Sequence, residues 1–194
     1  MAELAIWIAG GTTVAIFPTE TADTIRYVLE HSGASLLFVG KLDSWDAQKP
    51  GVPADLPCVA FPLAPKNSYE KWDDIVAHTD GMTGEPSREA NDLAMIIYTS
   101  GSTGQPKGAM HCFGHITAAA KGIIQQMDDN LGSNRQHRML SYLPLAHVFE
   151  RAFVESASFI HGRMQVFFAE SLDTFIQDLQ RAKPTIFISV PRLW

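Results

Sequence analysis

The chain has 194 residues, of which 46% are hydrophobic and 19% are charged, and its formal net charge is −6. This length is enough to bury one sizeable core, and the composition is that of an ordinary globular protein. The acidic balance, without any run of Lys and Arg, argues against nucleic acid as a partner. The two widely separated cysteines, Cys58 and Cys112, suggest neither a zinc site nor a disulfide framework, so a reducing cytoplasm is the expected compartment.

The first ninety residues predict helices and strands in alternation. An amphipathic helix is expected in MAELAIWIAGG, followed by a strand over 12–17, a helix over 21–31 and a strand over 35–39. The Pro-rich segment 40–89 is less regular, with a weak strand at 58–61 and a short helix at 69–78. The N-terminal residues carry an acidic Glu3 and lack the basic region of a signal peptide, and no apolar run is long enough to span a bilayer, although peripheral contact with membranes stays open.

A loop suited to phosphate follows the next predicted strand, in the run LAMIIYTSGSTGQPKG from Leu93 to Gly108. Glycine allows a positive φ and a close approach of the backbone to a ligand, and successive N–H groups then form an anion-binding concavity. Hydroxyl groups can donate to phosphate oxygens or bind Mg²⁺, and a lysine adds a mobile positive charge. The residues that offer these features are Thr99, Ser100, Gly101, Ser102, Thr103, Gly104, Lys107 and Gly108.

Two common phosphate loops do not fit this run. In the Walker A loop the lysine follows a glycine and precedes a hydroxyl residue, whereas Lys107 follows Pro106 and precedes Gly108. The dinucleotide fingerprint fails because Gly101 and Gly104 lack the leading glycine pair. A solvated Gly/Ser linker is the remaining alternative, but an apolar strand directly before the loop and a helix after it are not the surroundings of a linker.

The rest of the chain continues the alternation of helices and strands. Helices are predicted at 113–127, 147–160 and 171–182, a polar loop at 128–137, and strands at 139–143, 164–168 and 185–189. Strands separated by helices predict an α/β fold with a largely parallel sheet and helices on both faces. Ligands of such sheets bind beyond the carboxyl ends of the strands, which is where Thr99 is expected.

Several segments resemble one known family. YTSGSTGQPKG resembles the signature phosphate loop of the adenylate-forming superfamily, and SYLPLAHVFER at 141–151 resembles a motif of its long-chain fatty acid CoA ligases. LAIWIAGGTTVAIFPTETADT and KPTIFISVPRLW also resemble segments of these enzymes. The resemblance implies part of their large N-terminal domain, divided into αβ segments at 1–80 and 93–194 with a linker at 81–92. The C-terminal domain of the family is then absent, and this fragment alone is expected to be inactive.

The resemblance also implies a reaction. A fatty acid carboxylate attacks MgATP to give acyl-AMP and pyrophosphate, and coenzyme A then displaces AMP to form acyl-CoA. Thr99 matches the residue on the magnesium side, residues 100–104 match the cradle for the β- and γ-phosphates, and Lys107 matches the loop lysine. Lys107 and His147 are therefore the candidate catalytic residues. His147, a substrate-pocket residue by this resemblance, and Phe149 are the candidates for contact with the substrate, ahead of structural roles.

Other interpretations stay open. The enzyme class includes adenylating enzymes for aryl or amino acids, and a non-catalytic nucleotide-binding or interaction module is a further alternative. His111, Cys112 and His115 superficially suggest a metal site, but without a third strong ligand we assign them to the first turn of the helix after the loop. Glu150 and Arg151 are expected to brace their segment as a local ion pair.

Overall fold

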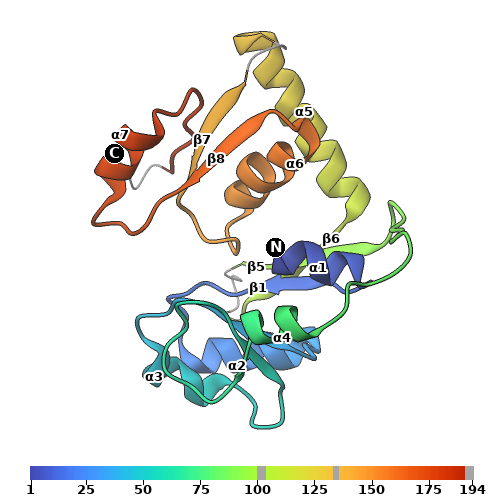
Figure 1. The fold of residues 1–194 in the computed structure, drawn as a ribbon, viewed down its shortest axis with the longest axis vertical. Coiled ribbons are helices and arrows are strands. Elements are labelled where there is room, and N and C mark those ends of the chain that lie inside the picture. The colour runs from blue at the N-terminus through green and yellow to red at the C-terminus, as the bar shows by residue number, and fades with distance from the viewer. Residues whose placement is uncertain (100–103, 133–135, 191–194) are drawn as a thin grey trace. The chain divides into compact units, whose positions relative to one another are not determined.

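The protein is described here by a computed structural model that covers residues 1–99, 104–132 and 136–190. Their contacts divide these residues into two compact units. The first unit consists of Met1–Arg88 and Ala94–Met110, and the second of Glu89–Leu93 with the described residues from His111 onward (Figure 1). The division of the chain expected from the sequence, with a linker at 81–92, stays a prediction.

The first unit contains two small sheets, each of three strands, in the orders β1-β5-β6 and β2-β3-β4. The pairs β1 with β5, β2 with β3, and β3 with β4 are parallel. Its elements, some of which extend a few residues beyond the unit, are α1 (Ala2–Ile8), β1 (Thr13–Ala15), α2 (Ala22–Ser32), β2 (Leu37–Val39), α3 (Trp45–Gln48), the 3-10 helix η1 (Lys49–Gly51), β3 (Cys58–Ala60), β4 (Glu70–Lys71), α4 (Trp72–His78), β5 (Leu93–Thr99) and β6 (Lys107–Cys112).

Helix α2 shows how the sequence sets an element of this unit. The side chain of Thr21 caps its start by accepting a hydrogen bond from the backbone N–H of Thr24 at 3.3 Å. One face of the helix buries Ile25, Val28 and Leu29, and each such side chain contributes about 1.5–3 kcal/mol on burial. Gly33 then ends the helix with a φ of 66°. The helix predicted over 21–31 is thus confirmed.

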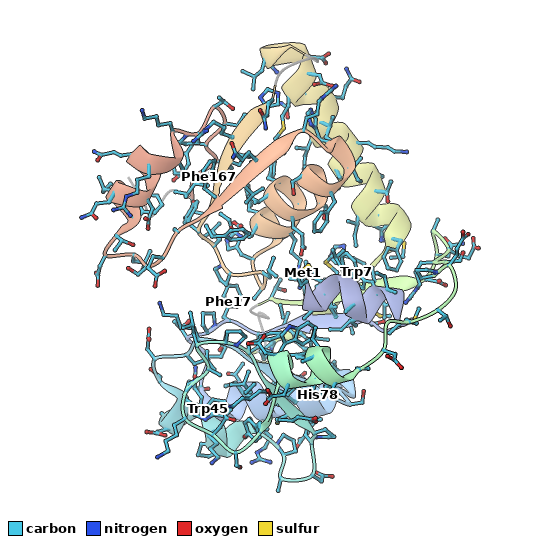
Figure 2. The ribbon with its side chains drawn as sticks, viewed as in Figure 1. Met1, Trp7, Phe17, Trp45, His78 and Phe167 are labelled. Atoms are coloured by element: carbon cyan, nitrogen blue, oxygen red, sulfur yellow. The ribbon has the colours of Figure 1, made fainter. Side chains whose placement is uncertain are left out.

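Helix α1 is tied to the strand that leads to the phosphate loop. The indole Nε1 of Trp7, labelled in Figure 2, donates a hydrogen bond to the carbonyl oxygen of Ala94 at 2.8 Å. Thr13 of β1 lies opposite Met95 of β5 in the parallel register. Because Ala94 and Met95 are both buried, the start of β5 is fixed from two sides within this unit.

The second unit is built around the parallel pair of β7 and β8, with the register running from His137 opposite Met164 to Ser141 opposite Phe168. Alternate residues of β7 face opposite sides of this pair, as expected for a strand. Met139 packs with Met127 and Val154, whereas Leu140 packs with Phe175 and Ala182. The elements of the unit are α5 (Phe113–Leu131), β7 (His137–Ser141), the π-helix η2 (Glu150–Ser156), α6 (Ala157–His161), β8 (Met164–Phe168) and α7 (Phe175–Ala182).

The α/β fold class is confirmed, with strand pairs that are parallel in both units. The strands form three small sheets, and β6 was not expected because its residues were assigned to the loop and the following helix. Helix α5 continues through the start of the expected polar loop, where Gln125 donates to Asp129 one turn later at 2.8 Å.

The strand predicted over 185–189 is not present in this described segment. The backbone N–H groups of Thr185 and Ile186 both donate to the carbonyl oxygen of Arg138, at 3.0 and 3.3 Å. Because both N–H groups donate to the same oxygen, they do not begin the regular series of hydrogen bonds that pairs two strands. The apolar run therefore packs beside β7 without pairing with it. Among the described residues no helix is both long enough and apolar enough to cross a membrane.

Candidate functional site

The phosphate-loop motif follows β5 in the first unit. Thr99 is the exposed last residue of the strand, and Lys107 is the exposed first residue of β6. Gly104 is described between them, whereas Ser100, Gly101, Ser102 and Thr103 lie outside the described residues. The two strands belong to one sheet, so the motif connects neighbouring elements with its hydroxyl end and its cationic end both open to solvent.

Two glycines of this motif have backbone environments that favour glycine. Gly104 has a φ of +88°, a conformation that other residues adopt only with strain. A Cβ on Gly108 would lie 2.8 Å from Cγ2 of Ile96 and 3.2 Å from Cζ of Tyr98, so β6 approaches β5 more closely than a side chain would allow. The first glycine provides the turn and the second the close packing of the two strands.

Tyr98 anchors the end of β5 just before the loop. Its hydroxyl lies 2.7 Å from Nδ1 of His31 on α2, and the two rings meet edge to face. Tyr27 stacks on His31 as well, with ring centroids 5.2 Å apart. Burial raises the pKa of the Tyr98 hydroxyl, and the nearby Tyr27 raises it further, so the hydroxyl stays protonated and available as a hydrogen-bond donor.

The second motif, at 141–151, lies in the second unit and places His147 at the start of a helical segment. The backbone N–H of His147 donates to the carbonyl oxygen of Pro144 at 2.8 Å, which closes the turn after β7. Nδ1 of His147 accepts a hydrogen bond from the backbone N–H of Phe149 at 3.2 Å. In the neutral ring this acceptor role leaves the proton on Nε2, which is then the atom able to donate to a ligand.

Glu150 and Arg151 brace this motif from inside the unit, each through partners of its own. Both residues are only 3% exposed. Glu150 accepts hydrogen bonds from the hydroxyl of Ser141 and from the backbone N–H of Leu143, the latter at 3.4 Å. Arg151 donates through Nε to the carbonyl oxygen of Leu145 at 2.6 Å and pairs with Glu155 at 3.5 Å.

These contacts clamp residues 141–145 onto the π-helix that follows. Burial raises the pKa of the Glu150 carboxyl, and the hydrogen bonds from Ser141 and from the backbone lower it in part. A π-helix widens the turn and is frequent at functional sites, and here its first two residues are the buried Glu150 and Arg151. The sequence did suggest a bracing role for them, but it could not identify Ser141 and Glu155 as partners.

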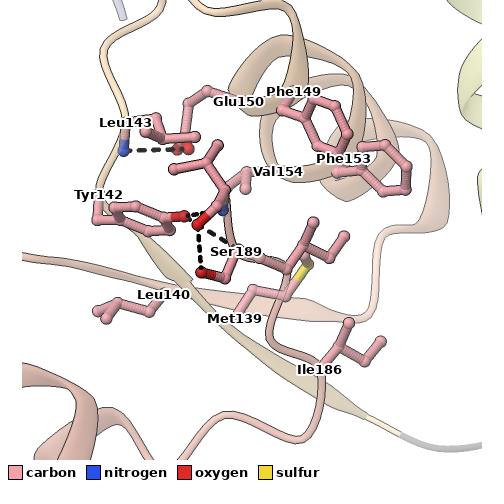
Figure 3. A pocket seen from close by; sticks show the side chains of 12 residues that line it. Met139, Leu140, Tyr142, Leu143, Phe149, Glu150, Phe153, Val154, Ile186 and Ser189 are labelled. Atoms are coloured by element: carbon pink, nitrogen blue, oxygen red, sulfur yellow. Dashed lines mark hydrogen bonds between the residues drawn. The ribbon is translucent and has the colours of Figure 1, made fainter. Parts of the chain in front are cut away.

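A pocket lies beside this segment, entirely within the second unit (Figure 3). It holds about 330 Å³ of space, counted together with open solvent. Phe149 stacks on Phe153 at one wall, with ring centroids 5.1 Å apart, and the Tyr142 hydroxyl donates to the carbonyl oxygen of Ile188 at 3.3 Å. The lining residues are mainly apolar: Met139, Leu140, Tyr142, Leu143, Phe149, Glu150, Phe153, Val154, Ile186, Ile188, Ser189 and Val190.

Of the two substrate candidates, Phe149 lines this pocket, whereas His147 is not among its described lining residues. The two remain neighbours, because their ring centroids are 5.9 Å apart. Ile186, Ile188, Ser189 and Val190 also line the pocket but were missed from the sequence, since their apolar run indicated only a buried strand.

The histidines after the phosphate loop are placed differently from the prediction. His111 and Cys112 end β6 rather than entering the helix, and only His115 lies in the first turn of α5. The side chain of His115 accepts a weak hydrogen bond, 3.5 Å long, from the backbone N–H of Cys112. Burial, together with the nearby His115 and Arg151, lowers the pKa of His111. Capping of the helix therefore accounts for His115, and the group of metal-ligand type found among the described residues is instead Asp128, His137 and His161.

Known proteins similar to this chain agree with the resemblance of its motifs. Long-chain-fatty-acid–CoA ligase ACSBG2 of Mus musculus is 31% identical over 207 residues, covering 96% of this chain and 30% of the ligase. Long chain acyl-CoA synthetase 4 of Arabidopsis thaliana is 30% identical, covering 93% of this chain and 29% of the synthetase. The chain thus spans about 30% of the length of these curated relatives.

Solved structures share the fold at lower identity. The anthranilate CoA ligase AuaEII in complex with anthranoyl-AMP matches with a TM-score of 0.76 and 20% identity, over 96% of this chain and 36% of that one. O-succinylbenzoate coenzyme A synthetase from Bacillus subtilis, in complex with ATP and magnesium ion, matches with a TM-score of 0.70 and 21% identity, over 96% of this chain and 45% of that one. A family model described as AMP-binding enzyme matches residues 1–194. This chain therefore belongs to the family of AMP-binding enzymes.

Proposed function

We propose that the protein carrying this chain is a long-chain fatty acid CoA ligase. It activates a fatty acid with MgATP to acyl-AMP and pyrophosphate, and then transfers the acyl group to coenzyme A. The observation that carries the proposal is the match of nearly the whole chain to relatives named as ligases and synthetases of long-chain fatty acids.

In the first step the phosphate loop holds the departing pyrophosphate. Negative charge develops on the departing pyrophosphate and must be neutralised. N–H groups and cations that are already in place neutralise it without any rearrangement during the reaction. The positive φ of Gly104 and the exposed positions of Thr99 and Lys107 fit such a cradle. Residues 100–104 and Lys107 bind the β- and γ-phosphates, and the Thr99 hydroxyl lies on the side of Mg²⁺, which supplies charge neutralisation when bound.

The motif at 141–151 handles the acyl substrate. Nε2 of His147 is the available donor of that ring, because Nδ1 already accepts from the backbone N–H of Phe149. It donates to an oxygen of the acyl or adenylate group, so we assign it to substrate binding at the reacting carbonyl. Phe149, which is 40% exposed, forms an apolar wall of the pocket with Phe153 and contacts the acyl chain.

The test is a panel of carboxylic acids in an ATP–pyrophosphate exchange assay with the purified full-length protein that carries this chain. Fatty acids of increasing chain length, aryl acids and amino acids are compared at equal concentration, and thioester formation with coenzyme A is followed by mass spectrometry. We expect exchange with long-chain fatty acids at least about tenfold above that with the other acids, the discrimination that a few methylene groups in an apolar pocket provide.

Other outcomes of the same panel would overturn the proposal. A preference for aryl or amino acids would make the protein an adenylating enzyme of another class. Nucleotide binding without exchange for any acid would make it a binding module.

A further inference from the structure

Two histidines and an aspartate converge in the second unit from three separate elements. Asp128 lies in the last turns of α5, His137 begins β7, and His161 ends α6. One ligand atom of each residue lies within 4.8 Å of the other two. We propose that Asp128, His137 and His161 form a binding site for a divalent transition-metal ion of the Zn²⁺ type, separate from the phosphate loop and independent of the proposed reaction.

Burial is the first argument for this site. His137 is 2% exposed, and the side chain of His161 is 1% exposed. The carboxylate side chain of Asp128 retains 23% exposure, which leaves the group reachable from solvent. Buried polar atoms in native proteins are normally satisfied, and buried charges are paired or coordinate metals. Two buried imidazoles beside a carboxylate that is open on one side resemble a ligand set with an entry path.

The facing atoms of His161 and Asp128 provide the second argument. Nε2 of His161 and Oδ1 of Asp128 are 3.7 Å apart, too far for a hydrogen bond. Each is buried and has no hydrogen-bond partner in the described part of the chain. The two atoms thus point at each other across a gap that neither fills, and a cation placed between them would satisfy both.

The spacing suits a metal after a small contraction. Ligands held about 2.0–2.1 Å from Zn²⁺ at a tetrahedral angle are roughly 3.4 Å apart. The 3.7 Å separation of His161 and Asp128 is close to this value, and the other ligand atoms of the group lie at most 4.8 Å apart. Asp128 can adjust its position by a change of rotamer, because its side chain retains exposed surface. Three protein ligands leave a fourth position for water, and imidazole favours Zn²⁺ and its neighbours over Mg²⁺.

Metal binding requires one change at His161. Its Nδ1 lies 3.3 Å from the backbone N–H of Arg163 and acts as the acceptor, so the neutral ring carries its proton on Nε2. Coordination through Nε2 moves this proton to Nδ1 by exchange with water and opens the contact with Arg163, which is already long for a hydrogen bond. A bound ion would link the end of α5 to the start of β7 and the end of α6, and would thereby stabilise the second unit.

The test is zinc binding by the purified protein. Competition with a chromophoric chelator gives the affinity, metal analysis gives the stoichiometry, and Co²⁺ substitution reports the ligand geometry through its visible absorption. We expect one Zn²⁺ per protein, not displaced by millimolar Mg²⁺. Asp128→Asn and His161→Gln should each weaken zinc binding by at least about tenfold, the lower end of the losses seen when metal sites are perturbed. Zinc at about ten times the parent's Kd should raise the melting temperature by roughly 3–5 °C in the parent and by about 1 °C or less in these variants.

His115→Gln is the matched control, because His115 is an exposed histidine on the same helix as Asp128. It should bind zinc like the parent. The proposal is overturned if the parent shows no saturable zinc binding, or if both variants bind as tightly as the parent. Loss of binding in His115→Gln alone would also overturn it, since the metal would then belong to His111, Cys112 and His115. If His161→Gln does not fold, Asp128→Asn decides, because its side chain is partly exposed and its loss leaves the core intact.

Discussion

The phosphate loop and the motif at 141–151 are held in place in different ways. Thr99 and Lys107, at the two ends of the loop, are exposed, and Gly104 between them has a φ of +88° that favours glycine. In the motif at 141–151, by contrast, Glu150 and Arg151 are 3% exposed and bind groups several residues away. An exposed loop can carry charge for a ligand at little cost to folding, whereas a buried charge must have partners and therefore couples function to stability.

This contrast separates the expected effects of mutation. Changes in the loop should alter activity and leave stability nearly unchanged. Changes in the buried clamp, the contacts of Glu150 and Arg151, should lower stability first. Activity should fall as a consequence, because these contacts hold the turn that carries His147.

The largest effect is expected for Lys107→Ala. The variant removes a cation from the proposed pyrophosphate site, and loss of one preorganised group at a site of developing charge lowers kcat about 10²–10³-fold. Its free energy of unfolding should stay within about 0.5 kcal/mol of the parent, since Lys107 is exposed. Pyrophosphate exchange and urea denaturation of the full-length protein that carries this chain measure the two quantities.

Lys121→Ala serves as the control for this variant, because Lys121 is also exposed but lies on α5. It should keep full exchange activity. Equal losses of activity in the two variants, or a large loss of stability in Lys107→Ala, would break the contrast between the loop and the clamp.

The next effect is expected for Glu150→Ala. The variant leaves the Ser141 hydroxyl and the Leu143 N–H without their buried acceptor, which should lower the free energy of unfolding by about 2–3 kcal/mol. Val148→Ala, at a position that is 50% exposed in the same segment, should change it by less than about 0.5 kcal/mol. If the two variants unfold at the same denaturant concentration, Glu150 does not clamp the segment.

The pH dependence of stability measures the contribution of the Glu150 charge separately from the packing of its side chain. Because burial raises its pKa in the folded protein above the ordinary value of 4.5, the folded state binds more protons than the unfolded state above pH 4.5. The contribution of Glu150 to stability therefore falls as the pH rises from 4.5 through the raised pKa. Glu150→Gln lacks this titration, so the parent should lose stability relative to Glu150→Gln over that window. Parallel denaturation curves of the two proteins from pH 4.5 to 8 would contradict the assignment.

The same contrast explains which parts were predictable from the sequence. Helix α2 was predicted from a local signal, the helical spacing of the apolar residues on its buried face, and the phosphate loop from residue types that act through their own backbone. The partners of Glu150 and the meeting of Asp128, His137 and His161 depend on where α5, β7 and α6 pack, which no short pattern encodes. The predicted strand at 185–189 failed for a related reason, since its apolar residues do pack beside β7 but its N–H groups converge on the carbonyl of Arg138.

The smallest effect is expected for Tyr98→Phe, which tests whether the loop too depends on a distant contact. The variant removes the hydrogen bond to His31 while keeping the ring, so the free energy of unfolding should fall by about 0.5–1.5 kcal/mol. If β5 ends in the same position without this bond, the Michaelis constant for ATP should stay within about twofold of the parent. A rise of tenfold or more at unchanged stability would show instead that α2 positions the phosphate loop through Tyr98, and the loop would then resemble the clamp in depending on residues far away in the sequence.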